Sequence, residues 1–215
     1  QNLPVILCLD RAGIVGEDGP THHGVFDMAY LRHIPNLVFM APATPSELKA
    51  MLDLAIKLER PVAIRYPKGF VSLPDRPVSM LELGKSEILM EGKDVAIISI
   101  GSMLETAIPL AERLAKKKVS AMVVNARFIK PLDDKMLADI ARRVKRIAIL
   151  EDGTAQGGFG SAVLEELDRL SQTGIKSRIF AIPDKFIEHG ARHELFAKYN
   201  LTPDAICDVI VRELI

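Results

Sequence analysis

The chain contains 215 residues, enough for one large domain or two small ones. Its 28 Lys and Arg residues equal its 28 Asp and Glu residues, so its net charge gives no reason to expect binding to nucleic acid or to an anionic membrane. Two cysteines are too few for a disulfide framework. No apolar run approaches the roughly 20 residues that span a bilayer, and no basic segment leads into an apolar one as in a secretory signal. We therefore expect a cytoplasmic protein.

Residues 1–66 alternate between short apolar runs and helical patterns. We expect strand, helix, strand, helix and strand in this order: Leu3–Leu9, Val25–His33, Leu37–Ala41, a helix that starts at Thr44, and Pro61–Tyr66. Thr44 is the expected N-cap of the second helix, and Glu47 would complete a capping box. This order predicts a parallel βαβαβ sheet with right-handed crossovers, in which ligands gather beyond the carboxyl ends of the strands.

Residues 67–93 contain several prolines and glycines and are typical of an interdomain linker, with a short strand pair near Ile88–Met90. We place the domain boundary between residues 78 and 79, which gives domains of 1–78 and 79–215. The second domain is again predicted to be α/β, and Pro109 predicts a kink or a late start in its first helix. Its expected strands are Val95–Ile100, Val119–Val124, Arg146–Leu150 and Arg178–Ile182, and its last helix starts at Thr202 and Pro203.

The sheet predicted for the first domain is unusually small. With three strands it would expose an edge and much of an apolar face. Either another chain completes this sheet, or the chain is a piece of a longer protein. We favour the second interpretation.

The polar segment 10–24 directly follows the first expected strand and contains four glycines. Arg11 is a permanent cation suited to a phosphate, and Asp18 is a compact acceptor for a hydroxyl or an ammonium group. His22 and His23 can exchange protons near neutral pH. A surface loop with solvated charges is the favoured interpretation of such a loop by itself, and becomes only equally good once its place at the carboxyl end of a strand is considered.

The motif RYPKG at 65–69 brings two further cations to the same edge of the sheet. By themselves, Arg65 would pair with an acid and Lys68 would be solvated. Beside Arg11, they make a site for a phosphorylated small molecule a fair hypothesis. The adjacent histidines His22 and His23 are a poor metal site, because neighbouring residues cannot easily face one ion. We therefore predict no metal ligands.

Two segments of the second domain also carry glycines or histidines. The glycine run 157–160 opens a helix, where it could cradle an anion or allow close packing, and the absence of cations between 151 and 161 favours packing. His189 and His193 lie four residues apart, but Gly190 interrupts any shared helix. A capping or interface role is favoured for them over metal binding.

The segment DRAGIVGEDGPTHHGVFDMAYLRHIPN, at 10–36, resembles the 1-deoxy-D-xylulose-5-phosphate synthase family of the transketolase superfamily. The likeness continues through RYPKG at 65–69, NARFIKPLD at 125–133, LEDGTAQGGFGSAV at 150–163 and IPDKFIEHGARHEL at 182–195. It implies a partial pyrimidine-binding domain followed by a transketolase C-terminal domain. It also implies a thiamin diphosphate and Mg²⁺ enzyme that condenses pyruvate with D-glyceraldehyde 3-phosphate, with loss of CO₂, in isoprenoid, thiamin and pyridoxal precursor synthesis.

The resemblance also implies roles for individual residues. Arg11 would hold the acceptor phosphate, and Lys68, where many members carry arginine, would share that role as a point charge. Asp18 would bind a substrate hydroxyl or position a proton relay. His22 would face the reactive carbon of the cofactor and assist proton transfer. His23 falls at a variable position and receives no role.

In this family, the segments that bind magnesium and diphosphate, the activating glutamate and the aromatic that stacks on the cofactor precede the region of likeness. The resemblance therefore implies that the fragment alone is inactive, and that its partners are a second copy in a homodimer or the missing N-terminal portion. Two alternatives stay open: a subunit of a split transketolase-superfamily enzyme, and a non-catalytic assembly or dimerisation module.

Overall fold

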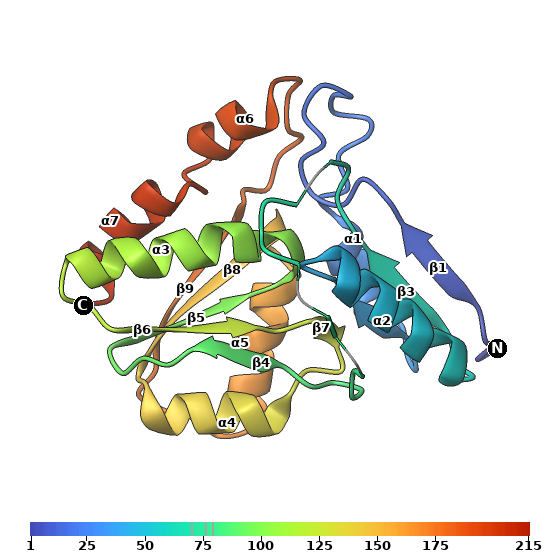
Figure 1. The fold of residues 1–215 in the computed structure, drawn as a ribbon, viewed down its shortest axis with the longest axis horizontal. Coiled ribbons are helices and arrows are strands. Elements are labelled where there is room, and N and C mark those ends of the chain that lie inside the picture. The colour runs from blue at the N-terminus through green and yellow to red at the C-terminus, as the bar shows by residue number, and fades with distance from the viewer. Residues whose placement is uncertain (70, 76, 79) are drawn as a thin grey trace.

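The computed structural model describes residues 1–69, 71–75, 77–78 and 80–215, and within them the strands form two sheets (Figure 1). The strand orders are β1-β3-β2-β7 and β4-β6-β5-β8-β9. This confirms the predicted α/β class, with two mainly parallel sheets. The predicted linker includes residues 70, 76 and 79, which lie outside the described residues, as does the start of the second predicted domain at residue 79.

The first sheet contains the three predicted strands and one that the sequence analysis missed. Its strands are β1 (Ile6–Leu9), β2 (Val38–Met40), β3 (Val62–Arg65) and β7 (Phe128–Lys130). The first three run parallel, as predicted, and β3 lies between the other two. Strand β7 comes from much later in the chain and pairs antiparallel with β2. Its three residues are too short a run for a periodic signal.

The first sheet was expected to expose an edge, and the pairing of β7 with β2 covers the edge on that side. Strand β1 remains at the edge of the described sheet, where it pairs with β3. Leu3, Val5 and Leu7, in and before this strand, are 54%, 46% and 44% exposed. An edge strand with exposed apolar side chains is a surface that another strand can extend.

The helices of the first domain are α1 (Asp27–Leu31) and α2 (Pro45–Lys57), and α1 is shorter than the predicted Val25–His33. Thr44 is the N-cap of α2, and its hydroxyl accepts the backbone N–H of Glu47 at 3.3 Å. The predicted capping box is wrong in its second hydrogen bond, which would join the Glu47 carboxylate to the backbone N–H of Thr44. The Glu47 carboxylate accepts the N–H of Ala43 at 2.9 Å and otherwise bonds to the second domain.

In the second sheet, β5 (Val95–Ser99), β6 (Ala121–Asn125), β8 (Arg146–Thr154) and β9 (Lys176–Ile182) run parallel. Strand β4 (Glu87–Met90) pairs antiparallel with β6. The predicted strand pair near Ile88–Met90 is therefore wrong: only β4 forms there, and its partner is β6 of the second sheet rather than another strand of the linker.

Helices cover both faces of this sheet (Figure 1). They are α3 (Leu104–Lys116), α4 (Asp134–Arg143), α5 (Phe159–Arg169), α6 (Arg192–Lys198) and α7 (Pro203–Glu213). Successive residues of β5 pack on opposite faces, since Ile97 lies with the apolar side chains of α3 and α7 and Ile98 with those of α4 and α5. The predicted late start at Pro109 is wrong, because α3 begins at Leu104 after the 3₁₀ turn Gly101–Met103.

The two domains share a hydrophobic core. Phe39 and Ala63 of the first sheet belong to the same buried cluster as Ala96 and Ile98 of the second. The first sheet therefore packs directly against the second domain. Among the described residues, no helix is long and apolar enough to cross a membrane.

Candidate active-site loop and the domain boundary

Segment 10–24 leaves the carboxyl end of β1 as a loop that is closed at its base. The N–H of Gly13 donates to the carbonyl of Gly24 at 2.8 Å, and the N–H of Gly24 donates to the carbonyl of Arg11 at 3.1 Å. A Cβ on Gly24 would lie 2.5 Å from that carbonyl oxygen, so glycine is required for the closure. The N–H of Ala12 donates to the carbonyl of Tyr66 at 3.0 Å, which ties the loop to the end of β3.

Three of the predicted site residues lie together at this edge. Lys68 Nζ lies 2.9 Å from each carboxylate oxygen of Asp18, and Arg11 Nε lies 3.3 Å from Asp18 Oδ2. The hydrogen bond from Lys68 and that from Arg11 hold the pKa of Asp18 below its usual range, against some desolvation. Arg11 itself has a φ of 57°, in the region that non-glycine residues rarely adopt. Asp18 therefore bridges Arg11 of the loop and Lys68 after β3, and Arg11 also pairs with Asp10 at 2.6 Å.

His22 does not join this cluster in the structure. It is exposed, and its Nδ1 lies 3.0 Å from the hydroxyl of its neighbour Thr21. Its backbone N–H donates to the carbonyl of Gly19 at 3.1 Å, which fixes the turn before it. The imidazole thus stands at the surface of the loop, where it is accessible for proton exchange.

His23, which received no role from the sequence, connects the loop to the second domain. Its Nδ1 accepts the backbone N–H of Val15 at 3.0 Å, so this nitrogen carries no proton. Its Nε2 lies 3.2 Å from the carbonyl oxygen of Glu188 and donates to it in that tautomer. The ring therefore bridges the middle of the loop and the segment that precedes α6.

Close packing continues along this contact. A Cβ on Gly16 would lie 3.0 Å from the carbonyl oxygen of Gly190, and one on Gly19 would lie 3.9 Å from His189 Cβ. Figure 1 shows the loop beside the segment before α6. His189 precedes α6 and His193 lies within it, so they share no helix. An interface position for His189 agrees with the preference for such a role over metal binding.

Arg65, the last residue of β3, is buried and neutralised rather than free to bind a ligand. Its Nε donates to Asp27 at 2.9 Å and its Nη1 donates to Asp152 at 2.6 Å. Asp152 also accepts the hydroxyl of Ser102 at 2.8 Å. Burial opposes the charge of Arg65, but the two carboxylates outweigh it and raise the pKa of the guanidinium. The expectation that Arg65 pairs with an acid is confirmed, and the pair crosses the domain boundary.

A second charged contact crosses the boundary at the start of α2. Glu47 is buried, and its Oε1 accepts hydrogen bonds from Asn125 Nδ2 and Arg127 Nε, both at 2.8 Å. Arg127 also pairs with Glu87 at the start of β4. A single carboxylate thus ties α2 to the last residue of β6 and to the segment that follows β6.

The glycine run 157–160 packs against a carboxyl group of the same chain, that of Glu151, rather than leaving its backbone donors free for a ligand. The buried Glu151 carboxylate accepts the N–H of Phe159 at 2.7 Å and that of Gly160 at 2.9 Å, at the N-terminus of α5. A Cβ on Gly158 would lie 2.2 Å from this carboxylate, and one on Gly160 would lie 2.8 Å from Ile179. Burial raises the pKa of Glu151 to about 7 against the lowering effect of the two backbone donors. Close packing, the favoured interpretation, agrees with this geometry.

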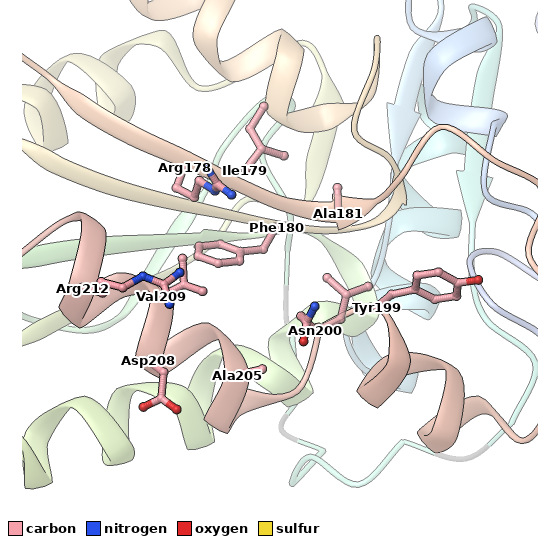
Figure 2. Close-up of a pocket in the computed structure, with 11 residues that line it drawn as sticks. Arg178, Ile179, Phe180, Ala181, Tyr199, Asn200, Ala205, Asp208, Val209 and Arg212 are labelled. Atoms are coloured by element: carbon pink, nitrogen blue, oxygen red, sulfur yellow. The ribbon is translucent and has the colours of Figure 1, made fainter.

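The described residues contain no group of three or more His, Cys, Asp or Glu side chains placed to hold a metal ion. The larger surface cavities also lie away from the predicted site residues. Figure 2 shows one of about 610 Å³ between β9 and α7, lined among others by Arg178, Phe180 and Arg212. A cavity of about 430 Å³ at the domain boundary does include Lys68.

Two family models together match most of the chain. The transketolase pyrimidine binding domain matches residues 1–72, and the transketolase C-terminal domain matches residues 84–206. The chain belongs to the transketolase family. Among curated proteins, it is 49% identical over 208 residues to a 1-deoxy-D-xylulose-5-phosphate synthase of Desulforudis audaxviator, covering 96% of this chain and 33% of that protein. It is likewise 49% identical over 209 residues to 1-deoxy-D-xylulose-5-phosphate synthase 1 of Geobacter metallireducens, again covering 96% and 33%.

The chain thus spans about a third of the length of the curated relatives it matches. Among solved structures, it resembles one described as a split gene transketolase, inactive beta4 tetramer. The TM-score is 0.90 at 29% identity, and the match covers 99% of this chain and 68% of that one. The resemblance to the family predicted from the sequence is therefore confirmed.

Several residues that organise this region were missed by the sequence analysis. Asp27 and Asp152 lie in quoted motifs but received no role, and Glu47 was interpreted as a local helix cap. Asp152 is the second residue after the predicted strand 146–150, so its place near a carboxyl end was a usable signal. The partner of Glu47 at Arg127 lies 80 residues further along the chain, and no local pattern reveals it.

Proposed function

We propose that this chain is the C-terminal portion of a 1-deoxy-D-xylulose-5-phosphate synthase. That enzyme would condense pyruvate with D-glyceraldehyde 3-phosphate, with loss of CO₂, in isoprenoid, thiamin and pyridoxal precursor synthesis. The observation that carries the proposal is the cluster of Arg11, Asp18 and Lys68, which joins two segments 50 residues apart at one edge of the sheet. Its support is the identity of 45–49% to proteins of that name.

The cluster is suited to binding a phosphate. Arg11 and Lys68 offer a guanidinium and an ammonium group, and both pair with Asp18. In the proposal, a phosphate takes the place of the Asp18 carboxylate between the two cations. Asp18 is then free to accept a substrate hydroxyl. The exposed His22 exchanges protons with the bound substrate.

The described residues do not fit the metal part of the cofactor, because they hold no group of side chains placed for a metal ion. We therefore propose that thiamin diphosphate and Mg²⁺ are held by a part of the enzyme outside these 215 residues. Thiamin diphosphate would supply the decarboxylation chemistry there, and we derive no step for it from this chain. The 215 residues alone are accordingly proposed to be inactive.

The proposal extends to the organisation of the protein. The domains meet between residues 78 and 79, the complete enzyme is a cytoplasmic homodimer, and the sheet edge at β1 takes up the preceding portion of the protein. The exposed Leu3, Val5 and Leu7 support this pairing, because burying them would stabilise the association.

A second candidate is a subunit of a split transketolase, which the likeness to the split gene transketolase favours. In that case a separate chain would supply the rest of the active site, and a ketose phosphate would replace pyruvate as the donor. A non-catalytic assembly module is the third candidate.

The test combines intact mass with a chimera. The purified chain should show a single mass near 23.7 kDa and no product with pyruvate, glyceraldehyde 3-phosphate, thiamin diphosphate and Mg²⁺. A chimera in which residues 1–215 replace the matching third of the Desulforudis audaxviator protein should form 1-deoxy-D-xylulose 5-phosphate. Turnover by the chain alone, or a folded chimera that prefers a ketose phosphate donor, would contradict the proposal. The split-subunit candidate predicts the second of these results.

A further inference from the structure

Residues 183–191, here called the strap, connect β9 to α6 and run beside the candidate loop (Figure 1). The carbonyl oxygen of Glu188, in the strap, lies 3.2 Å from His23 Nε2. The ring of Phe186 meets that of Phe26, two residues after the loop, edge-on with centroids 5.8 Å apart. The second domain therefore reaches the end of the loop through one backbone carbonyl and one aromatic ring.

The strap is itself anchored to α6 by the side chain of Glu188. Its carboxylate accepts hydrogen bonds from Lys198 Nζ and from the hydroxyl of Tyr199. Lys185 Nζ lies over the ring of Tyr199, 4.5 Å from its centroid. The hydrogen bond from Lys198, and then that from Tyr199, lowers the pKa of Glu188 to about 2, so the carboxylate is charged near neutral pH. Glu188 thus joins α6 through its side chain to His23 through its carbonyl.

The part of the loop next to this contact has little burial of its own. The side chains of residues 17–22 are exposed or half-buried, and they include Asp18 and His22. Such a segment gains little from apolar contacts to offset the entropy lost when it is ordered. Apart from the ion pairs of Asp18, hydrogen bonds at the two ends fix its position. His23, directly after His22, supplies those at the second end.

From these contacts we propose that Glu188 and Tyr199 are positioning residues for the substrate cluster. They hold the strap against His23, and His23 holds Asp18 and His22 in place relative to Lys68, which stands on a separate segment. The inference rests on the proposed function, which supplies the phosphorylated substrate. It adds a role in substrate binding for residues of the second domain that touch no substrate.

The first experiment is steady-state kinetics of variants of the active chimera. Tyr199→Phe removes the hydroxyl but keeps the ring beside Lys185, and His23→Leu removes both hydrogen bonds of the imidazole. Each should raise the KM for glyceraldehyde 3-phosphate about fivefold, the effect expected of one lost hydrogen bond, with kcat and the KM for pyruvate within about twofold. A merely structural role would instead lower kcat through loss of folded enzyme and leave both KM values unchanged.

Combining the two changes tests whether they act through one chain of contacts. The double variant should show the KM of the more affected single variant, because either change already releases the loop. His23→Gln, which keeps an acceptor and a donor on one side chain, should retain most of the affinity. Tyr30→Phe, at an exposed tyrosine of α1, is the matched control and should change nothing. Multiplying effects in the double variant, or equal rises of both KM values, would overturn the proposal.

The second experiment is amide hydrogen exchange of the 215-residue chain, which needs neither cofactor nor turnover. Tyr199→Phe should speed the exchange of the Val15 amide, the donor to His23, about threefold, and Tyr30→Phe should not. Unchanged exchange in Tyr199→Phe would overturn the proposal, whether or not the chimera is active. Failure of the unmodified chimera to form product, with exchange as expected, would instead contradict the proposed function alone.

Discussion

Asp152 on β8 accepts a 2.6 Å hydrogen bond from Arg65 at the end of β3, and both side chains are about 1% exposed. The pair joins the last residue of one central strand to the long strand of the other sheet. Because Asp152 also accepts a hydrogen bond from Ser102 and a Cβ on Gly13 would strike its carboxylate, the candidate loop, the first sheet and the 3₁₀ turn before α3 are all placed relative to this one side chain. The site loop therefore depends on the contact between the domains.

Replacing Asp152 by Asn should strongly destabilise the protein. The change removes one of the two carboxylates that neutralise the buried Arg65, and breaking such a pair costs about 3 kcal/mol. Urea denaturation measures the free energy of unfolding. Asp139→Asn, in an exposed pair with Arg143 on α4, is the control and should cost less than about 1 kcal/mol. Equal effects of the two changes would show that the buried pair is not important for stability.

Gly13 and Gly174 allow the effect of the Asp152 contact to be separated from backbone strain. Both have a left-handed φ, of 71° and 69°, but a Cβ on Gly13 would lie 2.3 Å from Asp152 Oδ2, whereas one on Gly174 meets nothing within 4 Å. Gly174→Ala should cost about 1 kcal/mol from strain alone. Gly13→Ala should cost about 2 kcal/mol more by thermal or urea denaturation, because it also displaces a buried carboxylate. Similar costs would argue against a tight contact.

The adjacent histidines should behave differently in amide hydrogen exchange. His23 accepts the N–H of Val15, and His22 contacts Thr21 at the surface. In His23→Leu the Val15 amide should exchange about fivefold faster, as expected for the loss of one hydrogen bond. In His22→Leu its rate should not change. Faster exchange of Val15 in both variants would mean that the whole loop responds, rather than this bond.

Glu151 should make stability depend on pH near neutrality. Its folded-state pKa of about 7 lies above the ordinary 4.5, so the folded protein favours the protonated carboxyl. Its contribution to the free energy of unfolding is complete below about pH 4.5 and is lost as the pH rises towards 7. The difference between the two pKa values corresponds to about 3 kcal/mol of unfolding free energy, because each pH unit between them contributes about 1.4 kcal/mol. Relative to Glu151→Gln, the wild type should therefore lose stability between pH 5 and 7.5 in urea titrations; a constant difference would refute this.

Lys68 should control affinity for the phosphorylated substrate in the active chimera. Lys68→Gln removes one of the two cations that flank Asp18, so the KM for glyceraldehyde 3-phosphate should rise about tenfold while that for pyruvate changes little. Lys68→Arg should retain most of the affinity, because it keeps the charge. Steady-state kinetics with each substrate varied in turn measures this. A parallel rise of both KM values would point to a structural effect instead.

The sequence by itself determined the local elements and the edge at which polar residues gather. Apolar runs predicted β1, β2, β3, β5, β6, β8 and β9, and Thr44 and Thr202 marked two helix starts. The glycine-rich loop was placed after β1, at one edge with Arg11, Asp18 and Lys68. These features depend on periodicity, capping and the geometry of parallel sheets, all of which are encoded within a few residues.

Only the tertiary structure decided which charged side chain meets which. Arg65 and Lys68 belong to one motif, yet Arg65 is buried between Asp27 and Asp152 while Lys68 faces Asp18. His23 rather than His22 ties the loop to the second domain. These pairings join residues that lie 38 to 165 positions apart, and burial decides their strength. No local pattern carries that information, because it arises only when distant segments pack together, within the first domain for Asp18 and Asp27 and across the domain boundary for Asp152 and Glu188.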